Sequence, residues 1–231
     1  MADMDVVTVV PNLHLLRFEF GQAYLWREGR SATLVDTGIA GAGADIVRYL
    51  REIDVELARI VLTHGHEDHV GSAAEVRAAT GAPVLAHRDD APIVRGERPR
   101  PDPVLLDWER PLFESIAPNV PAPPPCPVDQ ELVGGEVFDF AGGARVLSIP
   151  GHTDGSIALH LPKQRILFTG DTVAHVTEVM LGTCNLDRPR AVESFHRLAE
   201  LDVEVACFGH GDPITTAAGA ELRAAAANLT P

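Results

Sequence analysis

Cysteine is scarce in this sequence, with only Cys126, Cys184 and Cys207 among 231 residues. The three are widely spaced and odd in number, so they form no C-x-x-C motif and suggest no disulfide framework. Such thiols are ordinarily buried or unused. We therefore expect that the cysteines neither cross-link the fold nor carry out chemistry.

Long apolar runs are also missing. No segment approaches 18 consecutive apolar residues, the length at which a membrane-spanning helix becomes a candidate. The first five residues, Met1 to Asp5, are acidic and no apolar core follows them, whereas a secretory signal needs both basic residues and such a core. The sequence therefore predicts a cytoplasmic protein without a membrane partner.

Basic residues are few, with 19 Lys and Arg against 33 Asp and Glu, and the formal net charge is −14. The single lysine, Lys163, lies in no basic run. A nucleic-acid partner would need a basic stripe to neutralise phosphates, so none is expected. We expect a small-molecule substrate instead, and the oligomeric state stays open, with a homodimer as one alternative.

Strand patterns alternate with helix patterns along both halves of the chain. Strands are predicted at 6–10, 13–20, 32–36, 59–63, 83–87, 137–140, 145–149, 156–161, 165–169 and 204–208. Helices are predicted at 42–53, 72–80, 105–116, 187–201 and 215–229, with Ser72 and Glu75 as a capping box for the second. Two sheets packed face to face, with helices outside, would bury this pattern.

The stretch 88–130 has a different texture, because it holds most of the eighteen prolines. It is too long for an ordinary connection inside a compact domain. A lid, a dimerisation arm and a packed surface loop are all compatible with it. Trp108, Leu112 and Phe113 are its apolar groups most able to face a substrate, or else to pin the segment to the fold.

The segment from His64 to His69 concentrates metal-binding residue types directly after an apolar strand. Residues two apart on an extended chain point to the same side, so His64 and His66 are able to hold one ion. Asp68 and His69 then follow a turn and reach a second ion. Imidazole and carboxylate groups both bind zinc, and four such groups in six residues indicate a metal site.

Three further candidates each follow a strand and lie in a glycine-rich turn. His152 lies in P-G-H-T-D-G-S, Asp171 in T-G-D-T, and His210 in G-H-G. Glycine at such positions lets the backbone approach an ion closely. If the strands end at one rim, these side chains complete the set that begins at His64.

In this order, H-x-H-x-D-H, P-G-H-T-x-G-S, T-G-D-T and G-H-G resemble the metallo-β-lactamase superfamily over about residues 13–220. The resemblance implies an α/β (α+β) fold, a four-layer αββα sandwich forming one domain over 1–231, with 88–130 as an insertion or lid. It implies two metal sites with a shared carboxylate: His64, His66 and His152 for the first, Asp68, His69 and His210 for the second, and Asp171 bridging. Asp36, in L-V-D-T-G, matches a buried carboxylate expected to orient the metal-binding histidines.

The resemblance also implies a hydrolase with two divalent ions per chain. Zinc is the expected metal, although His and Asp donors also accept iron or manganese. A bridging water of lowered pKa would attack a small ester, thioester or lactone. Asp68 and Asp171 are the candidate catalytic groups, as ligands or proton acceptors. His175, four residues beyond Asp171, is expected to line the substrate pocket together with Trp108.

Other branches of the same superfamily fit less well. An iron-dependent persulfide dioxygenase is one alternative, but the G-R-T-D segment associated with it is missing. An acyl-homoserine lactonase is another. The motifs resemble most the glyoxalase II-like and lactonase-like hydrolases, although both of those branches use a tyrosine that this chain lacks, since Tyr24 and Tyr49 lie far upstream. A true metallo-β-lactamase lacks the bridging aspartate. A binding protein without activity would not need to retain all seven ligands.

Overall fold

The computed structural model describes residues 4–230, which form two compact units. The first unit comprises residues 4–100 and 118–132, and the second comprises residues 101–117 and 133–230. The single domain expected over 1–231 stays a prediction. The first three residues of the acidic N-terminal stretch, on which the expected location was partly based, lie outside the described part.

The first unit is built on a seven-stranded sheet in the order β1-β2-β3-β4-β5-β6-β7. Its strands are β1 (Asp5–Val10), β2 (Leu13–Arg17), β3 (Gln22–Glu28), β4 (Ser31–Val35), β5 (Glu56–Val61), β6 (Val84–His87) and β7 (Gln130–Leu132). Its helices are α1 (Gly43–Glu52), α2 (Glu67–Val70), α3 (Ala73–Thr80) and α4 (Ala91–Val94). Strands β1 to β4 pair antiparallel and β4 to β7 pair parallel, so the sheet is mixed.

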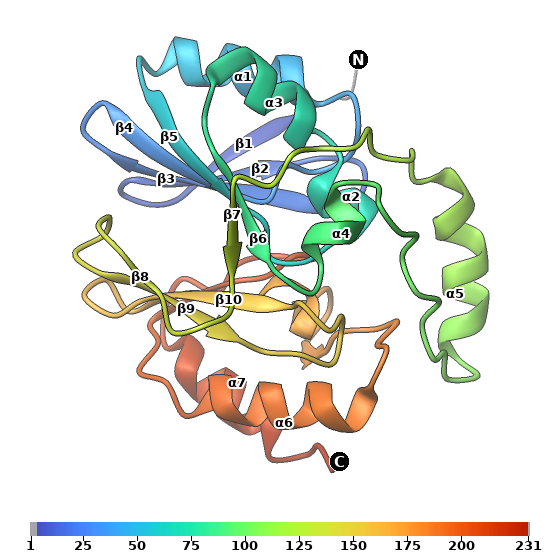
Figure 1. The fold of residues 1–231 in the computed structure, drawn as a ribbon. Coiled ribbons are helices and arrows are strands. Elements are labelled where there is room, and N and C mark those ends of the chain that lie inside the picture. The colour runs from blue at the N-terminus through green and yellow to red at the C-terminus, as the bar shows by residue number, and fades with distance from the viewer. Residues whose placement is uncertain (1–3, 231) are drawn as a thin grey trace. The chain divides into compact units, whose positions relative to one another are not determined.

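Helices α1 and α3 cover one face of this sheet (Figure 1). The apolar side of α1, with Ile46 and Leu50, packs with Val76 of α3 and with Leu34 and Ile60 of the sheet in one buried cluster. Fully burying a side chain of this size stabilises a fold by about 1.5–3 kcal/mol. The helical spacing expected over 42–53 is thus confirmed, and it positions the loops at the ends of β4 and β5.

The capping box expected at the start of α3 is wrong. Ser72 makes no side-chain cap; its hydroxyl donates to the Ile39 carbonyl at 2.6 Å and accepts from the Ala42 N–H at 2.9 Å. The Glu75 carboxylate accepts from the Gly43 N–H at 3.2 Å. Both side chains therefore satisfy N–H groups at the start of α1, since tertiary contact offers them partners that the local pattern cannot indicate.

The second unit holds a five-stranded sheet in the order β14-β11-β10-β9-β8 and a separate pair, β12-β13. The strands are β8 (Val137–Phe138), β9 (Ala144–Ser148), β10 (Ile157–Leu161), β11 (Ile166–Phe168), β12 (Val173–His175), β13 (Val179–Leu181) and β14 (Val205–Cys207). The helices are α5 (Glu109–Ile116), α6 (Arg188–Ala199) and α7 (Ala218–Ala226), with the 3-10 helix η2 at Gly170–Thr172; another, η1 (Ala117–Asn119), lies at the boundary between the units. Figure 1 shows α6 and α7 together below the strands of this unit.

Helix α6 begins where the sequence predicts. The Asp187 side chain accepts a hydrogen bond from the Arg190 N–H at 3.1 Å, which satisfies one of the donors that a helix start leaves open. Phe195 and Leu198 of α6 are buried with Leu167 of β11 and Leu222 of α7. These contacts form the core of the second unit and support the loops that follow β9, β11 and β14.

Several elements were not expected from the sequence, namely β3, α2, α4, β7, β12 and β13. Strand β3 is buried at its first five positions, so its residues show no alternation that would mark a strand with one exposed face. The others are only three or four residues long, which is too short for a periodic signal. Most predicted strands also end one or two residues later than the observed ones.

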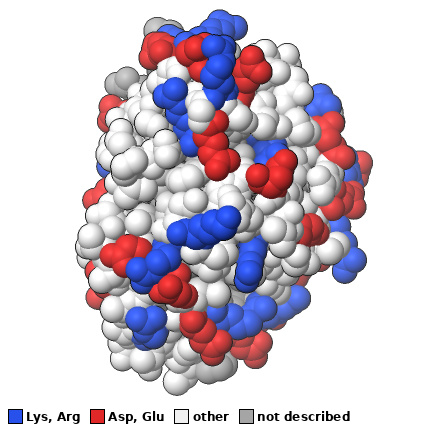
Figure 2. Space-filling view, turned by 90° about the vertical axis from the view of Figure 1, so that its left-hand side faces the viewer, with Lys and Arg blue, Asp and Glu red and all other residues white. Residues whose placement is uncertain are grey.

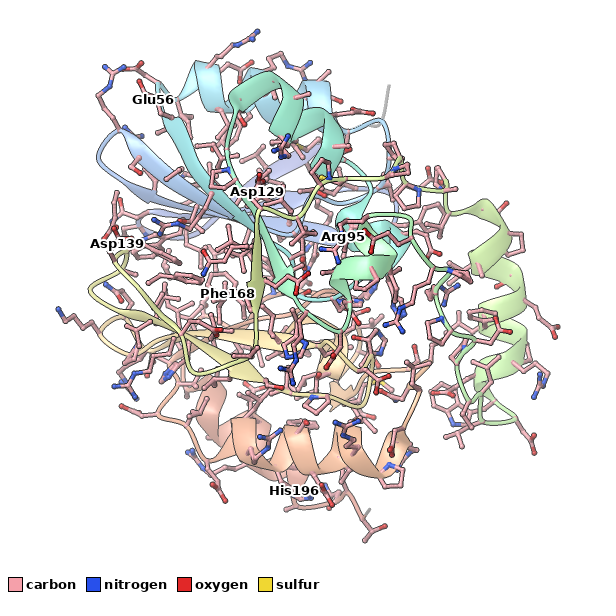
Figure 3. The ribbon with its side chains drawn as sticks, in the orientation of Figure 1. Glu56, Arg95, Asp129, Asp139, Phe168 and His196 are labelled. Atoms are coloured by element: carbon pink, nitrogen blue, oxygen red, sulfur yellow. The ribbon has the colours of Figure 1, made fainter. Side chains whose placement is uncertain are left out.

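The proline-rich stretch 88–130 is divided between the units. Asp129 accepts two hydrogen bonds from the Arg77 guanidinium and one from the Val84 N–H, and the Arg77 bonds lower the pKa of Asp129 to about 2. Arg95, at the end of α4, pairs with Glu131 of β7 at 2.8 Å, so α4 is tied to the strand at the end of the stretch. Figure 3 labels Arg95 and Asp129 in this region. Trp108, just before α5, is 55% exposed. The three alternatives for the part around α5, a lid, a dimerisation arm and a packed surface loop, stay predictions.

The surface carries charges of both signs. Lys and Arg side chains are interspersed with Asp and Glu on the face in Figure 2. Among the described residues, no helix combines the length and the apolar character needed to cross a bilayer.

The described cysteines are free thiols, and burial raises the pKa of Cys126 to about 11.

Buried His160 of β10 provides a test of how pH acts on the fold. Burial lowers the pKa of His160 below its usual 6.5, while a backbone hydrogen bond with Asp202 opposes this in part. Its stabilisation is therefore present above pH 6.5 and is lost as the pH falls through the lowered pKa. We expect the free energy of unfolding, measured with urea, to fall between pH 7.5 and pH 5.5, and to fall further for the unsubstituted protein than for His160→Leu. Parallel pH curves for the two proteins would contradict this prediction.

Candidate metal centre

The first unit brings four of the candidate ligands together where β5 runs into α2. The rings of His64 and His66 have centroids 4.6 Å apart, and those of His64 and His69 lie 4.1 Å apart. The His69 Nε2 atom lies 3.7 Å from an Asp68 carboxylate oxygen. The extended residues after β5 and the first turn of α2 therefore place donors from both chemical classes at one end of the sheet.

Asp36 lies beneath these ligands at the end of β4 and is 3% exposed. Its carboxylate accepts from the Thr63 N–H at 2.7 Å, from the Thr63 hydroxyl at 2.7 Å and from His69 Nδ1 at 3.0 Å. Its backbone has a φ of 61°, a left-handed conformation that aspartate tolerates better than most residues. The turn thus aims one carboxylate at two segments of the metal-binding loop.

These hydrogen bonds determine which nitrogen of each ring carries a proton. A carboxylate oxygen only accepts, so His69 Nδ1 must be the donor and its Nε2 keeps a lone pair. The Thr63 hydroxyl gives its one proton to Asp36, so it accepts from His64 Nδ1 at 3.0 Å, and His64 Nε2 also keeps a lone pair. This is the tautomer that a metal requires when it binds through Nε2.

The backbone around the loop is held by close contacts with the turn after Asp36. The Thr37 N–H donates to the His69 carbonyl at 2.7 Å, and the Gly71 N–H donates to the Gly38 carbonyl at 2.9 Å. A Cβ at Gly71 would lie 2.2 Å from the Ala40 nitrogen, so only glycine permits this approach. These contacts therefore hold the backbone that carries the ligands of the first unit in place.

The second unit brings the other three candidates together around one carboxylate. One Asp171 oxygen, Oδ2, lies 3.8 Å from His152 Nε2 and 3.1 Å from His210 Nε2. The Asp171 side chain is 11% exposed, and His152 is buried. A carboxylate between two imidazoles has the position that a bridging ligand between two ions would take.

Glycines allow the loops of the second unit to pack tightly behind these ligands. A Cβ at Gly182 would lie 1.7 Å from the Asp171 carbonyl oxygen. Gly151, with a φ of 134°, approaches the start of α6 so closely that a Cβ would lie 2.1 Å from the Ala191 nitrogen. The Leu186 N–H donates to the His152 carbonyl at 3.2 Å. The loop after β13 thus supports two ligands at once.

The remaining candidates take different positions. His175 lies in β12, and its backbone N–H donates to the His210 carbonyl at 3.1 Å. We call residues 209–212 the His210 turn. Trp108 stands before α5 and is mainly exposed. Thr63 was not recognised from the sequence, because its role depends on where one hydroxyl proton points. Gly182 was missed as well, since its importance comes from a contact with distant Asp171.

The donors in each unit fit a divalent metal ion. Within the units, the ligand atoms of His64 and His66, of Asp68 and His69, and of His152 and Asp171 lie within 4.8 Å of one another. Imidazole nitrogen with carboxylate oxygen is the donor set that zinc and other first-row divalent ions accept. Two carboxylates among the donors also offset part of the ionic charge.

Comparisons with known proteins agree with the motifs. The family model of the metallo-beta-lactamase superfamily matches residues 16–210. The probable metallo-hydrolase YflN of Bacillus subtilis is 29% identical, over 88% of this chain and 85% of that protein. A hydroxyacylglutathione hydrolase of Cereibacter sphaeroides is 32% identical over 77% of this chain, which spans only 56% of that longer protein.

Solved structures of the same family share the fold. A metallo-beta-lactamase family protein of Thermus thermophilus, TTHA1429, aligns with a TM-score of 0.67 and 26% identity, over 95% of this chain and 78% of that one. The protein TTHA1623, solved in a di-iron-bound form, aligns with a TM-score of 0.64 and 27% identity, over 84% of this chain and 89% of that one. Both curated relatives above are named hydrolases, the enzyme class that the motifs imply. The chain belongs to the metallo-β-lactamase superfamily and has the α/β fold of that family.

Proposed function

We propose that this protein is a dinuclear metal-dependent hydrolase that cleaves a small thioester. In this proposal the donors of both units together hold two ions, zinc being the expected metal. His64, His66 and His152 bind the first ion, Asp68, His69 and His210 bind the second, and Asp171 binds both. The family model supports the joining of the two sets, because its match over residues 16–210 includes all seven residues.

The observation that carries the proposal is the position of Asp171. Its Oδ2 atom lies near the Nε2 atoms of two histidines, at 3.8 Å from His152 and 3.1 Å from His210. A carboxylate that served one ion alone would not need a second imidazole at this distance. True metallo-β-lactamases lack this aspartate, so its presence favours another reaction of the superfamily.

The chain's own residues would prepare and support the reaction. When bound, divalent ions supply a Lewis acid for the substrate carbonyl and lower the pKa of water. Asp36 holds His64 through Thr63 and holds His69 directly, so both rings present Nε2. Asp68 and Asp171 are the nearby carboxylates able to accept a proton. The positive charge of the bound ions would stabilise the negative charge that develops on the carbonyl oxygen.

One relative and the amino-acid composition support the proposed substrate class. Hydroxyacylglutathione is an acyl group on a thiol, and the relative named for its hydrolysis is 32% identical to this chain. This chain has 19 basic residues against 33 acidic ones, a balance that disfavours a polyanionic thiol carrier. We therefore propose an acyl thioester of a small thiol with little charge. An oxygen ester or lactone would be a secondary substrate.

Metal content and substrate preference together test the proposal. We expect about two equivalents of metal per chain after purification without chelator. The protein should hydrolyse S-acyl thioesters faster than oxygen esters with the same acyl group, and a chelator should abolish the activity until zinc is added back. Elemental analysis and a panel of matched ester pairs provide the measurement.

Two results would contradict the proposal separately. A metal content near one equivalent, unchanged when zinc is added, would rule out the dinuclear site. A protein loaded with two equivalents that hydrolyses no thioester in the panel would rule out the substrate class while leaving the metal centre in place.

A further inference from the structure

The His210 turn is tied to β12 by three hydrogen bonds that all involve His175. The His175 N–H donates to the His210 carbonyl, and the His175 carbonyl accepts from the Asp212 N–H, both at 3.1 Å. The third bond joins the His175 ring to the same turn, with Nδ1 lying 2.7 Å from the Asp212 carbonyl oxygen. We call these three contacts the His175 clamp.

The chemistry of the side-chain bond is unambiguous. A carbonyl oxygen has no proton to give, so His175 Nδ1 carries a proton and donates it to Asp212. The ring also packs against Phe208, with centroids 5.6 Å apart and an interplanar angle of 57°. Phe208 is fully buried, so it offers the ring a fixed surface. The imidazole is therefore held at one atom and on one face.

Glycine at position 211 allows the His210 turn to approach His175 closely. Gly211 has a φ of 90°, and a Cβ at this position would lie 1.8 Å from the His175 carbonyl oxygen. On the other side of His210, the Gly209 N–H donates to the Gly170 carbonyl at 3.0 Å. His210 thus lies between one tie to the Asp171 loop and another to His175.

We propose that His175 is a positioning residue for His210. Through its Nδ1–H it fixes the backbone of residues 210–212, and so it keeps the His210 ring 3.1 Å from Asp171. Without this donor the Asp212 carbonyl loses its side-chain partner and the turn gains other conformations. Holding His210 in its ligand position then becomes less favourable. The inference rests on the proposed metal centre, and it replaces the expectation that His175 acts by touching substrate.

Three substitutions separate the parts of the clamp. Asparagine places an amide N–H near the position of Nδ1, so His175→Asn should retain the bond to Asp212. Glutamine places its polar group near the position of Nε2, so His175→Gln should lose that bond. His175→Phe keeps a ring against Phe208 but has no donor. His196 on α6 (Figure 3) provides a matched histidine outside the clamp, as His196→Ala.

The readout is cobalt(II) affinity of the full chain, measured in competition with a chelating indicator. We expect His175→Gln and His175→Phe to lower the affinity for one of the ions by about tenfold or more, the usual effect of losing a group that orients a ligand. His175→Asn should stay within about threefold of the original chain, and His196→Ala should match it. A change in the cobalt absorption spectrum should accompany the weakened site.

A double-mutant cycle shows whether the effect passes through His210. His210→Ala should itself weaken the same ion, and adding His175→Phe in that background should then change affinity little. Additive losses would contradict positioning through His210. If His175→Phe fails to fold, the Asn and Gln pair carries the same comparison.

The possible outcomes separate this inference from the proposed function. Unchanged cobalt affinity in the Gln and Phe variants, while His210→Ala loses affinity, would overturn the clamp and leave the metal centre intact. A loss in His175→Asn equal to that in the Phe variant would also overturn it, because the donor would then not matter. A rise in KM for His175→Asn alone, with all affinities unchanged, would assign His175 to the substrate. Absence of thioester hydrolysis would leave the affinity comparison valid.

Discussion

Replacing Asp171 by asparagine is expected to reduce kcat/KM for the best thioester by about three orders of magnitude or more, a barrier increase of about 4 kcal/mol. The amide is nearly the same size as the carboxylate, but it has lost the negative charge and one of the two oxygen acceptors. The group between His152 and His210 could then no longer bind two cations. His66→Ala should act similarly by removing a donor of the first ion. Steady-state kinetics on protein of measured metal content provide the test.

Asp202→Asn serves as the matched control. This carboxylate also lies in the second unit, but it is exposed and pairs with Arg165. Its loss should leave hydrolysis unchanged, because an exposed ion pair contributes little. If Asp171→Asn or Asp171→Ala retains more than about a tenth of the activity, a barrier change below about 1.4 kcal/mol, the bridging role of Asp171 is wrong.

Asp36→Asn is expected to weaken metal binding by about a hundredfold and to reduce hydrolysis accordingly, without unfolding the first unit. Asparagine tolerates the left-handed backbone at this position, so the turn should be retained. In the carboxylate, Oδ2 accepts from both the Thr63 hydroxyl and His69 Nδ1, while Oδ1 accepts from the Thr63 N–H. The single oxygen of asparagine cannot take both places, so its NH2 group faces either the Thr63 N–H or the two donors that orient the rings, and the loop is no longer held in the same position. Titration with zinc against a competing chelator measures the loss.

Thr63→Val gives a graded version of the same experiment. It removes only the hydroxyl that joins Asp36 to His64, while the bond from His69 remains. We expect a loss of about tenfold in affinity, smaller than that of Asp36→Asn. Asp45→Asn is the control, since this carboxylate is also buried in the first unit but pairs with Arg48 on α1. Equal affinity for Asp36→Asn and Asp45→Asn would contradict the orienting role.

The candidate ligands could be found in the sequence because their grouping is local. Four of them occupy the segment from His64 to His69, and the other three lie in glycine-rich turns after strands. The groups that orient them could not be found in the same way. Thr63 acts through the direction of one hydroxyl proton, and the clamp at His175 depends on the register between β12 and a turn more than thirty residues later.

The fold shows the same division between local and distant causes. Helix α6 was predicted because Asp187 caps its own helix, with Pro189 in the first turn. The capping box at Ser72 failed because tertiary partners on α1 competed successfully for its side chains. Strand β7 is only three residues long and is defined by its pairing with β6, so the proline-rich sequence before it gave no indication of it.

The hydrogen bonds between the turn after Asp36 and the metal-binding loop also bear on how the first unit opens. Thr37 and Gly71 donate their amide protons across the two segments, and the Ser72 hydroxyl joins the exit of the loop to Ile39 and Ala42. Exposing one of these amides to solvent requires both segments to separate, together with the start of α1. Small independent fluctuations are therefore blocked, and amide exchange here should follow the opening of a whole cooperative substructure. We therefore expect the backbone amides of residues 64–69 to be among the slowly exchanging ones, unlike those of active-site loops that open independently.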